Sequence, residues 1–268
     1  MERNDDMNRE FTLIKDYYDD GIDIYKKKTI LIKPGVTVLV GCNGIGKSTL
    51  LRQIKNILKK NNIPCIKYDN LTEGGEEARS KAGFFGDFQF LATASQSSEG
   101  ENIIMNMSNL ARDIGDFVRS GKNSEEEKFD RIPRVLNGEM QKEEHGIPNE
   151  RWILLDAVDS GLSVDNIVDI KEQLFKTILK YNYGNEIYII ISANEYEMAR
   201  DEQCFDVYNG KYVKFTDYEE YRDFILQSRE WKNQREQYRD DDADDRGDDK
   251  PWKRSRLQKR VISFGKLE

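Results

Sequence analysis

The segment at residues 41–49, "GCNGIGKST", constrains the fold of this chain more than any other stretch. It matches G-x-x-x-x-G-K-[ST], a loop whose glycines let backbone N–H groups curl around phosphate oxygens. An apolar strand-like run, 36–40, precedes it, and Leu50, Leu51 and Ile54 follow it at helical spacing. A plain glycine-rich turn between a strand and a helix would not require Lys-Ser after its last glycine. The segment therefore predicts a phosphate-binding loop at a helix N-terminus.

The residue types in this loop indicate their roles. Lys47 is expected to reach the β- and γ-phosphates of a nucleotide, and Ser48 to coordinate Mg²⁺. ATP and Mg²⁺ are thus the expected cofactors. The residues expected to contact the nucleotide are Gly41, Cys42, Asn43, Gly44, Ile45, Gly46, Lys47, Ser48 and Thr49.

Apolar patterns in the rest of the chain predict strands alternating with helices. Such alternation is typical of an α/β fold with a mainly parallel sheet flanked by helices. An antiparallel strand region is expected at the N-terminal end. Core strands are expected within 29–32, 36–40, 63–70, 152–158 and 185–194, and helices within 46–60, 102–118 and 164–181. In the last helix, the residues expected to face inward are Val164, Ile167, Ile170, Leu174 and Ile178.

Asp156 ends the apolar run of the strand at 152–155. A carboxylate at the end of a core strand beside a phosphate loop can hold the magnesium shell, so Asp156 is predicted to be a metal residue with Ser48. The alternative is an aspartate that caps a turn.

Composition and charge pattern indicate how the chain is organised. We expect one ATP-binding domain over 1–230, with a polar excursion at about 119–150 that contains the only histidine, His145, as a surface residue. The net charge is −8, three cysteines are widely spaced, and no apolar run approaches the roughly 20 residues of a membrane helix. These features predict a soluble, cytoplasmic protein with no membrane partner.

Residues 231–268 are predicted to form a charged tail, in which an acidic run precedes a basic one. The basic stretch at 250–260 surrounds Trp252 and could bind nucleic acid by phosphate pairing and base stacking. We favour a solvated tail, because the acidic run just before it neutralises the charge.

Four segments together resemble a known family. "GCNGIGKSTLL" has the spelling favoured by ATP-binding cassette (ABC-type) ATPases, including the SMC-like and RecF-like recombination ATPases. "SSEGE" at 97–101 resembles their signature motif, "ILLDAVDSGLS" at 153–163 their magnesium strand and dimer-contact loop, and "IIISANEYE" at 189–197 their switch-histidine strand. The motifs occur in the family's order, and the resemblance spans roughly residues 10–215. It implies a P-loop NTPase fold of the ABC-ATPase type.

The resemblance also implies a homodimer formed through ATP. Two protomers would sandwich two ATPs, with Lys47 and Ser48 of one chain facing Ser98 and Gly100 of the other, and with 160–163 touching the partner chain. A capping turn before a helix is the alternative interpretation of "SSEGE". The family often stacks an aromatic on adenine and reads the phosphate with a glutamine. The aromatic candidates are Tyr17, Tyr18 and Tyr25, which core packing explains better, and the glutamine candidates are Gln89 and Gln96.

Three departures from the family pattern affect catalysis. Ala157 occupies the usual general-base position, Asn194 the switch-histidine position, and Ser163 the place where the dimer loop commonly ends in aspartate. Asp159 could substitute for the base through a water, although it lies two residues further along. A general base contributes about 10²–10⁴ in rate, so slow hydrolysis is expected.

Two classes of function remain open. The first is an ATP-dependent dimerising clamp or switch, with slow or absent hydrolysis, that holds a nucleic acid or a protein complex. The second is an active ATPase that acts in DNA repair, recombination or another DNA transaction. The gap between the second core strand and "SSEGE" leaves no room for a long coiled-coil arm, which argues against an SMC protein of ordinary build.

Overall fold

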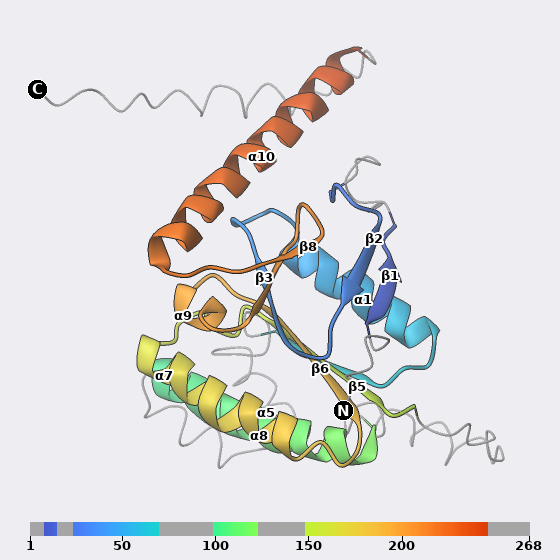
Figure 1. The fold of residues 1–268 in the computed structure, drawn as a ribbon, viewed down its shortest axis with the longest axis vertical. Coiled ribbons are helices and arrows are strands. Elements are labelled where there is room, and N and C mark those ends of the chain that lie inside the picture. The colour runs from blue at the N-terminus through green and yellow to red at the C-terminus, as the bar shows by residue number, and fades with distance from the viewer. Residues whose placement is uncertain (1–7, 15–23, 70–98, 123–147, 246–268) are drawn as a thin grey trace, which may run out of the picture. The chain divides into compact units, whose positions relative to one another are not determined.

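The computed structural model describes residues 8–14, 24–69, 99–122 and 148–245, which form two β-sheets flanked by helices (Figure 1). The strands are β1 (Arg9–Thr12), β2 (Thr29–Ile32), β3 (Gly35–Val40), β4 (Cys65–Asp69), β5 (Glu150–Asp156), β6 (Glu186–Ser192), β7 (Gln203–Asp206) and β8 (Lys211–Val213). The helices are α1 (Lys47–Lys60), α5 (Glu99–Ser120), α7 (Val164–Asp169), η1 (Ile170–Phe175), α8 (Lys176–Lys180), α9 (Tyr196–Ala199) and α10 (Tyr218–Asp245).

The main sheet has six strands in the order β4-β5-β6-β3-β7-β8. Its pairings are parallel except for the antiparallel pair β7–β8. β1 and β2 form a separate antiparallel pair, with Arg9 opposite Ile32. The predicted α/β fold, with a mainly parallel sheet and N-terminal antiparallel strands, is confirmed at this level.

The two faces of the main sheet carry separate apolar cores, because neighbouring strand residues point to opposite faces. Ile153 and Leu155 of β5 pack with side chains from α5, α7, η1 and α8. Trp152 and Leu154 pack with α1 and the β1–β2 pair, and Trp152 stacks on Tyr188 with ring centroids 3.9 Å apart. Figure 1 shows α5 and α8 on one side of the sheet and α1 with β1 and β2 on the other. Burial on both faces explains the near-continuous apolar runs of the central strands.

The helical segment at residues 164–180 departs from the predicted pattern. A π-helical stretch, η1, interrupts it, and such a stretch changes which side chains face the sheet. Ile167 and Ile178 are buried as expected, whereas Val164 is 60% exposed, so its predicted inward position is wrong. Phe175, which the helical period did not mark, is buried instead.

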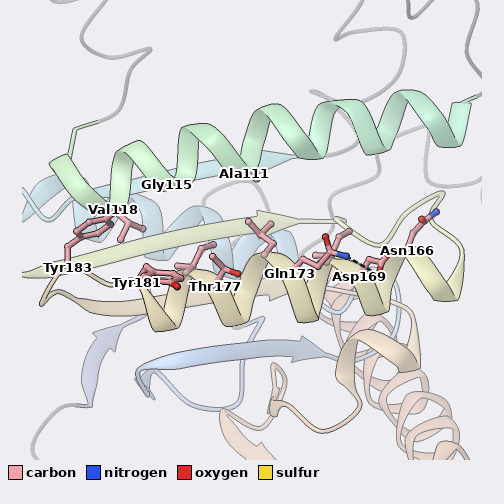
Figure 2. Close-up of a pocket in the computed structure, with 12 residues that line it drawn as sticks. Ala111, Gly115, Val118, Asn166, Asp169, Gln173, Thr177, Tyr181 and Tyr183 are labelled. Carbon is pink, nitrogen blue, oxygen red and sulfur yellow. Dashed lines mark hydrogen bonds between the residues drawn. The ribbon is translucent and has the colours of Figure 1, made fainter.

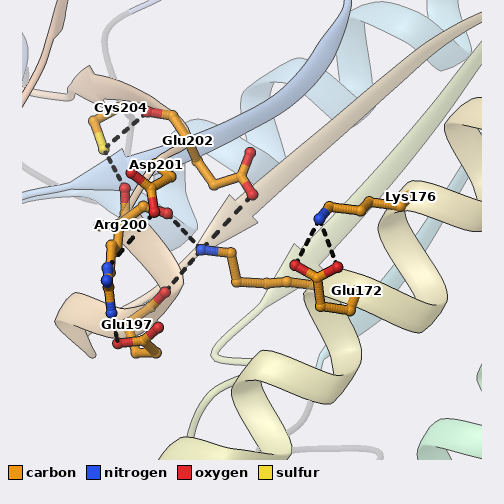
Figure 3. Close-up of polar contacts among 9 residues, drawn as sticks. Glu172, Lys176, Glu197, Arg200, Asp201, Glu202 and Cys204 are labelled. Atoms are coloured by element: carbon orange, nitrogen blue, oxygen red, sulfur yellow. Dashed lines mark hydrogen bonds and ion pairs between the residues drawn. The ribbon is translucent and has the colours of Figure 1, made fainter.

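Lys171 of η1 ties this segment to α9 and the turn before β7. Figure 3 shows Glu197, Arg200 and Glu202 of the cluster that it joins. The Lys171 ammonium donates hydrogen bonds to the carbonyl oxygens of Glu197 and Arg200 and lies 3.7 Å from the Glu202 carboxylate. Carbonyls at the end of a short helix lack intrahelical partners, so Lys171 satisfies part of that need. The cluster stabilises the strand-to-strand connection after β6.

Helix α10 was not predicted from the sequence, which indicated a charged tail from residue 231. The chain divides into two compact units, Met1–Arg229 and Glu230–Glu268, and α10 has the bounds Tyr218–Asp245. Residues 231–245 of the expected charged tail are therefore helical, with an ion pair from Lys232 to Glu236 one turn apart. Pairs at this spacing support a helix with a largely polar surface. The basic stretch at 250–260 lies outside the described residues.

None of the helices in the described part of the chain is both long enough and apolar enough to cross a membrane.

Candidate functional site

The loop at residues 41–49 joins β3 to α1, as predicted, and its glycines adopt backbone angles that other residues rarely adopt. Gly41 has φ 142° and Gly46 has φ 119°. A Cβ on Gly46 would lie 2.8 Å from Cγ2 of Ile24, and one on Gly41 would lie 2.9 Å from Cγ2 of Ile45. Conformation and space therefore both require glycine at these two positions. The loop therefore has the glycine-dependent conformation and the place between a strand and a helix that the motif predicted.

Tyr25 supports this loop from the side of the apolar core. Its hydroxyl donates a hydrogen bond of 2.9 Å to the Gly46 carbonyl, and its ring is buried in the core beneath the loop. The position agrees with core packing, not with an adenine-stacking face. Tyr17 and Tyr18, the other two aromatic candidates, lie outside the described residues.

Lys47 begins α1 and turns its ammonium back toward the loop. Nζ donates to the Gly41 carbonyl at 2.7 Å and to Oδ1 of Asn194 at 3.0 Å. Burial lowers the pKa of this ammonium, while the nearby charges of Cys42, Asp159 and Asp156 oppose that shift. Two neutral oxygens compensate a buried cation only in part, so the position favours an anion beside Nζ.

Ser48 and Asp156 meet as the predicted magnesium pair would. Ser48 Oγ donates to Oδ1 of Asp156 at 3.0 Å, although β6 lies between the strands that precede the two residues. Asp156 Oδ2 lies 3.5 Å from Nζ of Lys67, which is also 3.5 Å from Oδ2 of Asp69. Lys67 was not anticipated, because nothing in a strand sequence indicates which neighbour its side chain will pair with. Its register does place it there, since Asp69 lies opposite Asp156.

Asp159 anchors the segment that follows β6. Its Oδ2 accepts hydrogen bonds from the backbone N–H groups of Asn194 at 2.6 Å and Glu195 at 2.7 Å. Its Oδ1 is buried and has no hydrogen-bond partner among the described residues. A buried carboxylate oxygen without a partner costs free energy, which a bound water or ligand donor would recover.

Ala157 lies directly after Asp156 in a left-handed backbone conformation, with φ 51°. Its N–H donates to the Ser192 carbonyl at 3.1 Å, and its methyl group is buried. A non-glycine residue in this conformation is uncommon and marks a tightly constrained turn. The turn carries no group that can accept a proton at this position.

The residues brought together fit a magnesium nucleotide. The glycine cradle offers backbone donors at a helix N-terminus, and Lys47 supplies a buried positive charge. The hydroxyl and carboxylate oxygens of Ser48 and Asp156 are the hard ligands that Mg²⁺ prefers. The partner-free Oδ1 of Asp159 is a further polar group that a bound ligand or water can satisfy.

The residues expected to face a partner chain are described only in part. Gly100 lies in the first turn of α5, which begins at Glu99, while Ser98 lies outside the described residues. Ser163 is exposed, precedes α7 in an extended conformation and accepts a hydrogen bond from Asn166. Ser163 is thus the N-cap residue of α7, and its hydroxyl contacts a side chain of the same helix. Gln89, Gln96 and His145 also lie outside the described residues.

Two residues of α10 complete the site, and the sequence analysis missed both. Ser228 Oγ accepts a hydrogen bond from the Cys42 N–H at 2.8 Å, and the Tyr221 hydroxyl donates to the Asn194 carbonyl at 2.9 Å. The only sequence signal for them was that Tyr221 and Ser228 are seven residues apart, a spacing that places two residues on one face of a helix.

A cavity of about 560 Å³ lies between α5 and the α7–α8 segment (Figure 2). Gly115 lines one side, and Gln173, Thr177 and Tyr181 line the other. None of the lining residues belongs to the loop at 41–49 or to the ends of β5 and β6. The cavity is therefore separate from the candidate phosphate site.

No protein-family model matches this chain, and no curated protein matches it at significant similarity.

Proposed function

We propose that this protein binds Mg²⁺–ATP at residues 41–49 as an ABC-type P-loop NTPase and uses it as a dimerising clamp or switch with slow or absent hydrolysis. The observation that carries the proposal is the convergence of Lys47, Ser48 and Asp156 at the carboxyl end of a parallel sheet. Ligands of open α/β sheets bind in that position. Lys47 would neutralise phosphate charge, and Ser48 and Asp156 would hold the metal.

Slow hydrolysis is proposed because the site lacks titratable groups at two places. Ala157 has no proton acceptor beside Asp156, and Asn194 offers Lys47 an amide oxygen where the family has histidine. The remaining groups position and neutralise the phosphates, which provides most of the catalysis in phosphoryl transfer but does not remove a proton from water. ATP would persist long enough to hold a closed homodimer.

An active ATPase that acts on DNA or a protein complex is the second candidate. The observation that favours it is the partner-free Oδ1 of Asp159, a buried carboxylate oxygen on the loop after β5. If that oxygen accepted a proton from an attacking water, directly or through a second water, the missing base at Ala157 would not limit turnover.

One pair of measurements tests both candidates. Molar mass in solution is measured without nucleotide, with ADP and with ATP, each with and without DNA, and steady-state turnover is measured at saturating Mg²⁺–ATP. The clamp predicts a dimer with ATP only and turnover well below one per second. Faster turnover supports the active ATPase, and equal masses with ADP and ATP contradict a switch. A DNA complex that requires ATP would identify the partner class.

A further inference from the structure

One face of α10 contacts both the loop at residues 41–49 and the segment that follows β6. Ser228 holds the Cys42 amide of the loop, and Tyr221 holds the Asn194 carbonyl at the end of β6. Both side chains are buried, with 1% and 4% exposure. Since about 3.6 residues make one helical turn, they lie two turns apart on the same face. One helix therefore contacts both the loop at residues 41–49 and Asn194, the two segments beside the proposed phosphate site.

Each contact fixes a backbone group in a defined position. The Ser228 hydroxyl donates to the Ile225 carbonyl at 2.7 Å, which leaves its lone pairs to accept from Cys42. The Asn194 backbone is held on both sides, because its N–H donates to Asp159 and its carbonyl accepts from Tyr221. Each segment is thus joined to α10 by one hydrogen bond.

Lys47 closes the connection between the two segments. Its ammonium donates to the carbonyl of Gly41, the residue before Cys42, and to the side chain of Asn194. The chain of contacts thus runs from Ser228 through the loop and Lys47 to Asn194 and back to Tyr221. Connected hydrogen bonds of this kind act as a unit, so loss of one affects the others.

We propose that Ser228 and Tyr221 are positioning residues that hold the loop and Asn194 at the spacing required to bind the phosphates of ATP. This inference rests on the proposed function and deepens it, because it makes α10 the element that sets nucleotide affinity. Neither residue touches the nucleotide; each acts through a backbone group. A displacement of α10 along its axis would therefore weaken ATP binding without any change in the sequence of the loop.

The test uses the full chain with Ser228→Ala, Tyr221→Phe and the double variant. Calorimetry gives the Kd for Mg²⁺–ATP, and urea unfolding without nucleotide gives stability. Each single change should weaken ATP binding about 3- to 10-fold, as the loss of one hydrogen bond does. The double variant should lose less than the product of the single losses, because either change already releases the same connection.

Tyr212→Phe is the matched control. The Tyr212 hydroxyl accepts a hydrogen bond from the Lys33 N–H at 2.9 Å and pairs with Thr37 Oγ1 at 3.2 Å, away from the loop. Removing this hydroxyl should lower the free energy of unfolding by about as much as removing the hydroxyl of Ser228 or Tyr221 does. The Kd for Mg²⁺–ATP should stay within about twofold of wild type. A purely structural role for α10 predicts instead that all three hydroxyl deletions behave alike.

The outcomes separate this inference from the proposed function. If wild type binds no ATP, the proposed function fails and this inference fails with it. If wild type binds ATP and both single variants bind equally well, only the positioning role is overturned. Losses that multiply in the double variant would also overturn it, because they would show two independent contacts. Should Ser228→Ala fail to fold, the Kd for Mg²⁺–ATP of Tyr221→Phe is compared with that of Tyr212→Phe. Equal values would overturn the positioning role.

Discussion

The two halves of the candidate site are built in different ways. The loop half, residues 41–49, is shaped by backbone conformation, with glycines at φ values that only glycine readily adopts. The strand-end half, residues 156–159 with 194–195, is shaped by side chains that hold backbone groups, above all by the Asp159 carboxylate. The loop half carries the glycines, Lys47 and Ser48, which the proposed nucleotide binding uses together with Asp156. In the strand-end half, Ala157 and Asn194 cannot exchange a proton, and the Asp159 carboxylate accepts two backbone N–H groups.

Under the proposed function, this difference predicts that ATP binding and ATP hydrolysis respond to changes at different residues. The scaffold around Ala157 and Asn194 is tightly held, so the absence of a titratable group there does not reflect a loosened structure. Changes at Lys47 in the loop half should therefore alter affinity, and changes at Ala157 and Asp159 in the strand-end half should alter turnover or stability.

The largest expected effect is on the loop half. Lys47→Ala should weaken Mg²⁺–ATP binding by about 10- to 100-fold, because a charge-assisted contact to phosphate is lost. Stability without nucleotide should change much less, since burial already disfavours this ammonium. Calorimetry and urea unfolding measure the two quantities. Lys60→Ala, an exposed lysine on the same helix, is the control, and equal ATP affinity in both variants would remove the loop from the site.

A second change restores a base to the strand-end half. Ala157→Glu should raise single-turnover hydrolysis about tenfold, a fraction of what a general base can contribute. The left-handed backbone of Ala157 already accommodates a residue with a Cβ, so glutamate adds no new backbone strain. Ala157→Gln, which has the same length but no carboxylate, is the matched control and should be neutral. The double change with Asn194→His should exceed either single change.

A third change asks whether Asp159 acts as a scaffold or as a base. Asp159→Asn should leave turnover within about twofold of wild type and lower the free energy of unfolding by about 1 kcal/mol, because a charged acceptor of two N–H groups becomes neutral. Single-turnover hydrolysis and urea unfolding provide the measurements. A fall in turnover of a hundredfold or more would identify Asp159 as the base and erase the contrast between the halves.

The smallest effect lies outside both halves, at Glu202. Burial raises the pKa of this carboxyl above its ordinary 4.5, while Lys171 opposes the shift. A raised pKa in the fold means that the protonated form contributes stability below pH 4.5, which is lost as pH rises through the folded pKa. Glu202→Gln should remove this loss, so the stability of the variant relative to wild type should rise as the pH rises above 4.5. Urea unfolding over pH 4 to 7 measures the gain, and ATP affinity should not change.

Local patterns in the sequence were sufficient for the loop half and for the strands that end beside it. The motif, the apolar runs and Asp156 all lie within short stretches whose meaning does not depend on distant residues. Ser228, Tyr221 and Lys67 could not be found this way, because each contributes through a partner far along the chain. α10 is polar on most of its surface, so its pattern does not indicate which face packs. The apolar period also marked Val164, which is exposed at the N-terminal end of α7, and it missed Phe175, which is buried in the π-helical stretch η1.

The strand order also has a consequence for how the chain folds during synthesis. β3, which carries the loop, lies between β6 and β7 in the sheet, so Gly35 pairs opposite Tyr188. β3 therefore has no neighbour in the main sheet until the ribosome has made most of the chain. Parallel pairings between distant segments form slowly, because a long loop must close before any contact compensates the lost entropy. A nascent chain released before residue 192 would leave the apolar strand β3 without its partner, and aggregation of such fragments would measure that vulnerability.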